Sequence, residues 1–304
     1  MATEQKNSPA GLWAALENME AAATHLLSQE LGPFEASLRS CYEAGVQAPT
    51  LKGSRHKEPD MLLAALFLKR VLNDLRGLWV LIRSGYSSQA ASVAASLFEN
   101  ALLVVSLVGN RTNASKLRAS PQGELPWGPI DLAKVAARRQ QREVRQAGGS
   151  FDDTQYERAW REVYSAYKWL CQVKHPTLPS AAHDAFGASV RPDEYVLMAA
   201  PDVRDTDLAV KATILAISVN RALEAIQAFA GSLQGHESEP NYREFQARLE
   251  SSWVGAIEAY KSIGRGSLPF DISESGLARE WVKLKRKQGG STRLPGRSSK
   301  KGPV

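Results

Sequence analysis

Cysteine is scarce in this chain, since Cys41 and Cys171 are the only two among 304 residues. Two cysteines that lie 130 positions apart are too few for a disulfide framework and have the wrong spacing for a zinc site. Each lies in an apolar helical pattern, so we expect buried free thiols. The chain also lacks a Walker A loop, a GxGxxG turn and an HExxH helix. These absences predict no metal site and no cofactor.

A targeting sequence and a membrane span are also missing from the pattern. The first 20 residues, MATEQKNSPAGLWAALENME, have neither a basic start nor a continuous apolar stretch. The most apolar run, residues 97–108, is too short to span a bilayer and contains Glu99 and Asn100. We therefore expect a soluble, cytoplasmic protein with no membrane partner.

The net charge of +6 does not describe an evenly basic surface. Residues 285–304 hold seven lysines and arginines and no acidic residue, which leaves 31 basic against 32 acidic residues in the rest of the chain. This tail is rich in glycine, serine and proline and has no apolar period, so we expect a disordered tail. Two roles remain open for it, a solubilising terminus or a salt-sensitive, non-specific contact with nucleic acid.

Helical spacing of apolar residues dominates the remaining sequence, and the alternation typical of strands is confined to one short stretch, residues 195–198. We predict an all-α fold, a mostly antiparallel up-and-down helical bundle with extra N- and C-terminal helices. The predicted helices cover residues 9–31, 34–44, 59–83, 89–108, 131–146, 151–173, 205–233 and 242–263, with a further short helix at 276–287.

These segments divide the chain into four predicted parts. Residues 1–58 form N-terminal helices, and residues 59–234 form the main helical bundle. Residues 235–284 form C-terminal helices packed on the bundle, and residues 285–304 are the basic tail.

The most informative polar feature is the corner at Lys174-His175-Pro176. Proline disfavours the α conformation in the residue before it, so the corner predicts a helix end at His175. A cationic Lys174 and His175 also suit the negative end of a helix dipole. Counting back by three and four positions gives one stripe of the helix, which contains Gln172, Lys168, Ser165 and Arg161. This stripe is either a solvent face or a polar groove.

Glu99 is the second unusual residue, because it lies where helix 89–108 becomes apolar on every side. A buried carboxylate needs a cationic or hydrogen-bonding partner, or it loses its charge. The candidate partners are Arg70, Arg76 and Arg83 on the preceding helix, together with Arg161 and His175. A structural ion pair and a functional site would use the same partners.

The stretches RSGYSSQAASVAASLFEN and YSAYKWLCQVKHPT carry a resemblance. In them an RxG turn leads into a helix that ends in SLFE, and a helix some 65 residues later ends in His-Pro. This arrangement resembles a family of uncharacterised bacterial helical proteins similar to the HEPN superfamily (higher eukaryotes and prokaryotes nucleotide-binding). The resemblance covers about residues 60–230 and implies a bundle of mostly up-and-down helices.

The resemblance also implies where a site would lie. In HEPN proteins that cleave RNA, an arginine a few residues ahead of a histidine forms the site, usually at a dimer interface. Here Arg161 precedes His175 by 14 positions, and none of the five histidines has an arginine in the required window. The candidate catalytic residues are His175, Arg161 and Glu99, and the candidate binding residues are Arg70, Arg83, Lys168 and Lys174.

Because the catalytic motif is off its spacing, we expect a non-catalytic protein that binds a ligand or a partner. The alternative is an RNA-binding protein or a metal-independent ribonuclease in stress or phage defence. In that case His175 would act as acid or base and Arg161 would stabilise the developing phosphorane-like charge. The partners predicted on this basis are RNA or a nucleotide, and a second copy of the chain in a homodimer. His183 and Asp184, close to His175, are a weak hint of a metal site.

Overall fold

The computed structural model describes residues 9–121, 124–175, 177–187 and 199–263. Within these ranges the chain forms ten α-helices, two short 3-10 helices and no strand, which confirms the all-α prediction. The elements are α1 (Pro9–Glu30), α2 (Gly32–Gln47), η1 (Ala48–Thr50), α3 (Pro59–Arg83), α4 (Ser87–Leu107), α5 (Arg111–Ala119), α6 (Pro129–Gln146), α7 (Asp153–Lys174), α8 (Leu178–Gly187), α9 (Asp205–Gly231), η2 (His236–Ser238) and α10 (Tyr242–Ile263). The strand predicted at 195–198, the helix predicted at 276–287 and the basic tail lie outside the described residues.

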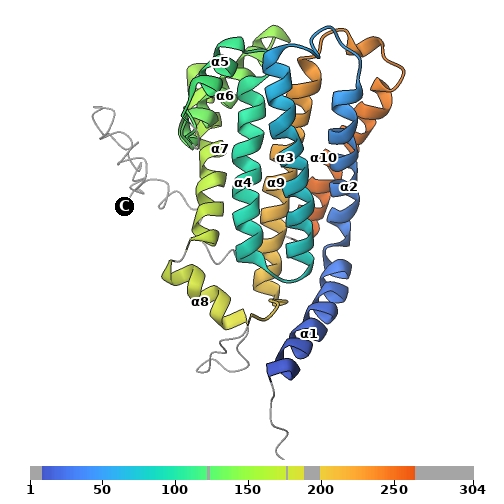
Figure 1. Cartoon of the computed structure of the whole chain (residues 1–304), viewed down its shortest axis with the longest axis vertical. Helices are drawn as coiled ribbons and strands as arrows, with labels where there is room; N and C mark the ends of the chain where they lie inside the picture. The colour runs from blue at the N-terminus through green and yellow to red at the C-terminus, as the bar shows by residue number, and fades with distance from the viewer. Residues whose placement is uncertain (1–8, 122–123, 176, 188–198, 264–304) are drawn as a thin grey trace, which may run out of the picture. The chain divides into compact units, whose positions relative to one another are not determined.

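Helix α4 is the centre of the bundle. It runs antiparallel to α3 after a short turn, and α9 packs against both helices (Figure 1). Helices α6 and α7 pack on each other and on α4, whereas α2 and α10 pair with each other and also contact α9. The short connection between α3 and α4 enforces their antiparallel arrangement.

The sequence of α4 explains this central place. Four small residues, Ala90, Ala91, Ala94 and Ala95, line its first half and let its neighbours approach closely. From Leu97 to Leu107 every residue except Glu99 is buried. Burial of each large apolar side chain contributes roughly 1.5–3 kcal/mol. By length and composition α4 is also the one described helix that could cross a membrane, but 78% of its apolar window is buried inside the bundle.

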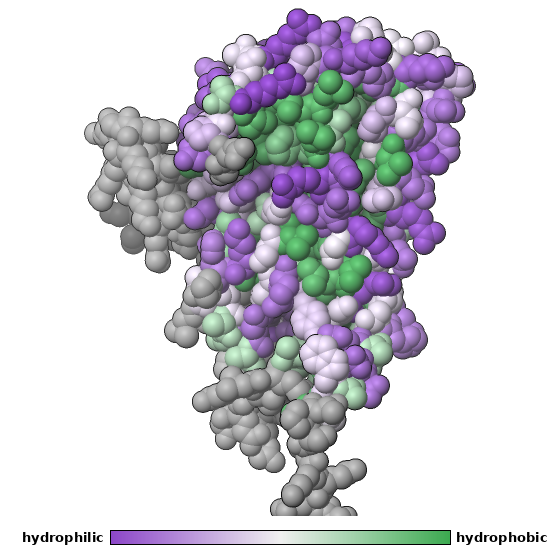
Figure 2. Space-filling view, in the orientation of Figure 1, coloured by the Kyte–Doolittle hydropathy of each residue, from purple (hydrophilic) through white to green (hydrophobic). Residues whose placement is uncertain are grey.

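The surface that covers this core is mixed. Figure 2 shows hydrophobic areas on this face of the molecule, separated by hydrophilic ones. On α3 the exposed large apolar side chains are Leu62, Leu66 and Val80. Scattered exposed side chains of this kind are normal for a folded protein.

Two described helices lie in segments that the sequence predicted as connections. Helix α5 is short and polar, and the side chain of Asn110 caps it by accepting a hydrogen bond from the Asn113 backbone N–H at 3.0 Å. Helix α8 follows the proline of the His-Pro corner. Neither has a long apolar period, so apolar spacing did not predict these two helices. The prediction that Cys41 and Cys171 are buried free thiols is confirmed.

Candidate functional site

Glu99 has a different partner from the one predicted. Its side chain is half-buried, and its Oε1 accepts a hydrogen bond from the Tyr167 hydroxyl of α7 at 2.5 Å. No ion pair of Glu99 occurs among the described residues, so the expected contact with a cation is absent. The reason is local: the Tyr167 ring packs against Phe98, with 5.7 Å between centroids, and this brings its hydroxyl to the carboxylate. Burial, assisted by Glu99, raises the pKa of Tyr167 above its ordinary value.

His175 and Arg161 do not form one site. His175 caps the C-terminus of α7 in extended conformation and is exposed, as expected for a residue before proline. Arg161 forms an ion pair with Glu157 at 2.7 Å, and its guanidinium lies over the Trp160 ring. The 14 positions between Arg161 and His175 correspond to about 21 Å along a helix. One small substrate group cannot contact both side chains at that separation.

The four candidate binding residues lie on two helices that α4 separates (Figure 1). On α3, Arg70 is exposed, and Arg83 lies over the Trp79 ring at 5.5 Å. On α7, Lys168 and Lys174 are half-buried. These cations therefore do not gather into a basic patch of the kind that a polyanion requires.

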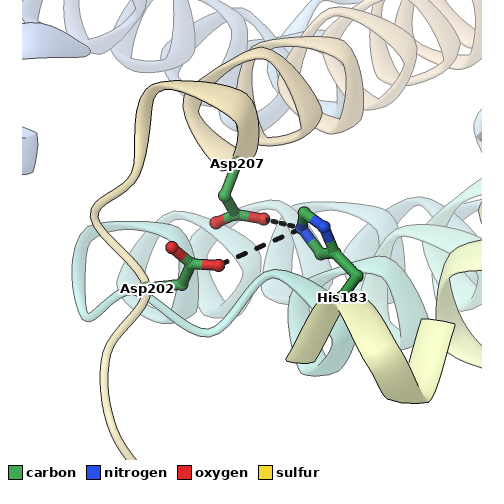
Figure 3. Close-up of side chains that lie close together, drawn as sticks. All are labelled: His183, Asp202 and Asp207. Atoms are coloured by element: carbon green, nitrogen blue, oxygen red, sulfur yellow. Dashed lines mark hydrogen bonds and ion pairs between the residues drawn. The ribbon is translucent and has the colours of Figure 1, made fainter. Parts of the chain in front are cut away.

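The structure instead brings six polar residues together at the end of the bundle where α3 turns into α4. We call them the ionic cluster: Ser87, His183, Asp202, Arg204, Asp207 and Lys211. Ser87 begins α4, His183 lies on α8, and the other four lie at or just before the start of α9. Figure 3 shows the His183 imidazole pointing toward the carboxylates of both Asp202 and Asp207.

Asp207 lies at the centre of the ionic cluster and is only 1% exposed. Its carboxylate contacts three polar side chains. The Ser87 hydroxyl donates to Oδ2 at 2.6 Å, and His183 Nε2 lies 2.8 Å from Oδ1. The Lys211 ammonium, four residues later on α9, forms an ion pair with Oδ2. These three contacts compensate for the burial of the Asp207 carboxylate.

Asp202 and Arg204 complete the ionic cluster from the segment that precedes α9. The Arg204 side chain donates through Nε to Asp202 Oδ1 at 2.9 Å and also reaches the His183 carbonyl at 2.8 Å. Lys211 Nζ donates to the backbone carbonyl of Asp202 at 2.8 Å. The Asp202 N–H donates to the carbonyl of Gly85 at 3.0 Å. These bonds join the α3–α4 turn, α8 and α9.

The pKa values follow from burial and from the neighbouring charges. Burial lowers the pKa of Lys211 to about 7, against the opposing effect of the Asp202 carboxylate. Burial and the Arg204 guanidinium lower the pKa of His183, which favours its neutral imidazole. Burial alone would raise the pKa of Asp202, but its hydrogen bonds with Arg204 outweigh this effect and lower it.

A divalent cation could fit the ionic cluster by distance alone. One ligand atom from each of His183, Asp202 and Asp207 lies within 4.8 Å of the others. However, Asp202 is already paired with Arg204, and Asp207 is already paired with Lys211. A divalent ion would add charge to a balanced, buried network, which is unfavourable. The ionic cluster therefore has a structural role, because its contacts hold the α3–α4 turn, α8 and α9 together.

A second feature is a groove of about 610 Å³ between α6 and α7 on one side and α9 on the other. Its lining residues are Ala136, Arg139, Gln140, Glu143, Phe151, Gln155, Arg158, Ala159, Glu162, Val163, Ala166, Ile217, Asn220, Arg221, Glu224, Gln227, Ala228 and Trp253. The lining of α9 runs from Ile217 to Ala228, which corresponds to about 16 Å. We refer to this feature as the α6–α7–α9 groove.

Three arginines of the groove are each paired with a glutamate of the same helix. Arg139 and Glu143 are 2.6 Å apart, Arg158 and Glu162 are 2.7 Å apart, and Arg221 is paired with Glu224. Two of these arginines are largely buried. The guanidinium of Arg221 lies over the Phe98 ring at 5.6 Å, and Arg139 reaches across to the carbonyl of Ala228 on α9. The groove therefore offers charges of both signs with no net excess.

Only part of the ionic cluster carried a sequence signal. The sequence offers His183 as a weak hint of a metal site, but it does not identify Ser87, Asp202, Arg204, Asp207 or Lys211. The available signal was Lys211, a cation within the apolar run of α9, placed four residues after Asp207. The groove had no signal, because its walls come from separate helices.

No protein-family model, curated protein or solved structure matches this chain, so its resemblance to the HEPN superfamily stays a prediction.

Proposed function

We propose that this protein is a non-catalytic binding protein whose α6–α7–α9 groove holds a short polypeptide segment of a partner. The observation that carries the proposal is the chemistry of the lining. It combines three arginine–glutamate pairs, four side-chain amides and two aromatic rings. Among its described lining residues there is no histidine, cysteine, serine, threonine, tyrosine, lysine or aspartate, and each of its three glutamates is paired with an arginine. The lining therefore offers no imidazole base and no hydroxyl, thiol or amine nucleophile.

A peptide matches this chemistry better than a nucleic acid does. The amides of Gln140, Gln155, Asn220 and Gln227 can each donate to and accept from a peptide backbone. A length of about 16 Å accommodates roughly five residues of an extended chain. The paired charges suit side chains of either sign, whereas RNA binding needs unpaired cations along its path.

A groove variant with a matched control tests this proposal. Peptides would be selected from a random displayed library on the intact protein, and their affinities measured by fluorescence anisotropy. Arg158→Glu changes an exposed groove residue, and Arg142→Glu makes the same change on the exposed part of α6 outside the lining. We expect the first variant to lose about tenfold or more in affinity, the value of one charge-assisted hydrogen bond, and the control to bind like the parent.

Equal affinity of both variants would show that the peptides bind elsewhere and would overturn the proposal. A single-stranded RNA oligonucleotide serves as the competing probe. If RNA binds with a steep salt dependence and no library peptide is retained, the nucleic-acid alternative replaces the peptide proposal.

A further inference from the structure

Helix α1 carries an apolar stripe that nothing in the described part of the chain covers. Three of its large residues, Leu12, Met19 and Leu26, are 49%, 38% and 41% exposed. They are seven positions apart, and the exposed Ala15 and Ala22 lie between them. Together these five residues follow the three-four alternation of a helix-packing seam. We call them the α1 stripe.

A neighbouring face of α1 holds it on the bundle. Ala23 and Leu27 are buried, and the Tyr86 hydroxyl donates a hydrogen bond to Glu20. Between positions 11 and 22, every residue except Leu16 and Glu20 is exposed. A helix with so little support is marginal in water, so burial of the α1 stripe would stabilise it. Figure 1 shows α1 at the end of the bundle opposite α5.

We propose that the α1 stripe is the interface of a homodimer, in which the α1 helices of two copies pack antiparallel about Met19. In the order leucine, alanine, methionine, alanine, leucine, the α1 stripe reads the same from either end. A two-fold axis at Met19 therefore places Leu12 of one copy beside Leu26 of the second copy. Such self-complementarity is what an isologous interface requires.

The charged residues of α1 favour an antiparallel pair over a parallel pair or a membrane contact. Its charged residues are Glu17, Glu20 and Glu30, and it contains no lysine or arginine. Glu17 and Glu20 lie on faces of α1 away from the α1 stripe, and in the antiparallel pair the two copies of Glu30 lie at opposite ends of the interface, so no two carboxylates meet. A parallel pair would place Glu30, at the end of the α1 stripe, opposite its own copy, and like charges there are destabilising. The lack of basic residues also disfavours an anionic membrane surface as the occupant.

The length of the contact sets the expected strength. The 14 positions from Leu12 to Leu26 span about 21 Å, which is a small interface of the weak to moderate class. We expect a dissociation constant in the micromolar range. The α6–α7–α9 groove is not involved, so this inference does not depend on the proposed function.

Light scattering coupled to size-exclusion chromatography tests the dimer on the full chain. The parent should form dimers between about 1 and 100 µM. Met19→Glu should raise the dissociation constant at least about tenfold, because two carboxylates would meet at the axis. Ala21→Glu, on the exposed side of α1 away from the α1 stripe, is the matched control and should dimerise like the parent. Monomeric parent protein at about 100 µM, or an equal response of the two variants, would overturn the proposal.

Cysteine crosslinking tests the direction of the helices and does not depend on the glutamate variant. A mixture of Leu12→Cys and Leu26→Cys proteins should form a mixed disulfide dimer under mild oxidation, whereas Leu12→Cys alone should not. Self-crosslinking of Leu12→Cys without a mixed product would show a parallel pair and refute the antiparallel interface. If the parent stays monomeric and instead sediments with neutral phosphatidylcholine vesicles, the α1 stripe is a lipid contact and the dimer is wrong.

Discussion

The buried pair of Asp207 and Lys211 gives the sharpest energetic prediction. Asp207→Asn removes the carboxylate that directly contacts the Lys211 ammonium, and Lys211→Met leaves the Asp207 carboxylate with only Ser87 and His183 as donors. Removing one partner of a buried ion pair costs about 3–5 kcal/mol. We expect each single variant to lower the free energy of unfolding by about that amount at about pH 6, where Lys211 is charged.

The double variant should cost less than the sum of the two singles, because it does not leave one charge of the pair without the other. The expected coupling energy is about 2–3 kcal/mol, at the upper end for residues in one network. Urea unfolding followed by circular dichroism measures all three values, since the described part of the chain is mainly helical. The surface pair Arg158–Glu162 has the same four-residue spacing and is the control. Its coupling should be only about 0.3–0.5 kcal/mol.

Additive costs at Asp207 and Lys211 would refute this reasoning, because they would show that the two charges do not stabilise each other. Costs below about 1 kcal/mol for both singles would also refute it, since they would place the pair in contact with water.

Four further predictions follow from single contacts. Tyr167→Phe should lower the free energy of unfolding by about 1–3 kcal/mol, because the half-buried Glu99 loses its hydroxyl donor; denaturant titration measures this, and no loss would mean that water replaces the hydroxyl. Burial raises the pKa of the Cys41 thiol to about 12, so a thiol reagent should label it only after unfolding; rapid labelling of the native protein at Cys41 would contradict its burial. Native Lys211 has a lowered pKa of about 7, so the unfolded state binds more protons than the native state between about pH 7 and 10. The free energy of unfolding of the parent minus that of Lys211→Met should therefore rise with pH across that window. A difference that does not change with pH would show that the pKa is not lowered. Gly85→Ala should lower the free energy of unfolding by about 1–3 kcal/mol, because the φ angle of Gly85 is +87° and an added Cβ would lie 2.6 Å from the Pro201 side chain. An unchanged melting temperature would contradict this.

The parts of the fold that sequence predicted well are those with local signals. Helix α3 begins and ends at the predicted residues, because Pro59 suits a first turn and Ser84-Gly85 ends the helix. Helix α7 ends before His175 for the reason expected from the following proline. By contrast, α5 is only nine residues long and polar, so periodicity could not distinguish it from a connection.

The candidate site was predicted poorly because its contacts are not local. Ser87 and Asp207 are 120 positions apart in the sequence, and no period relates them. At Glu99 the rule that a buried carboxylate seeks a cation gave the wrong partner. The Tyr167 ring packs on Phe98, and this brings the Tyr167 hydroxyl to the Glu99 carboxylate. A hydroxyl donor compensates for the burial of a carboxylate as a cation would.

Two buried carboxylates explain how a bundle with an open groove keeps its form. Asp60 in the first turn of α3 is fully buried, and it accepts from Arg55 at 2.8 Å and from the Gly109 backbone N–H at 2.9 Å. Asp207 has the matching place in the first turn of α9, where the helix dipole also stabilises a negative charge. Since α3 and α9 begin at opposite ends of the bundle, each end is locked by its own network (Figure 1). Contacts outside the groove therefore fix its walls. A ligand that enters between α7 and α9 binds with a small free-energy cost for reorganising these helices.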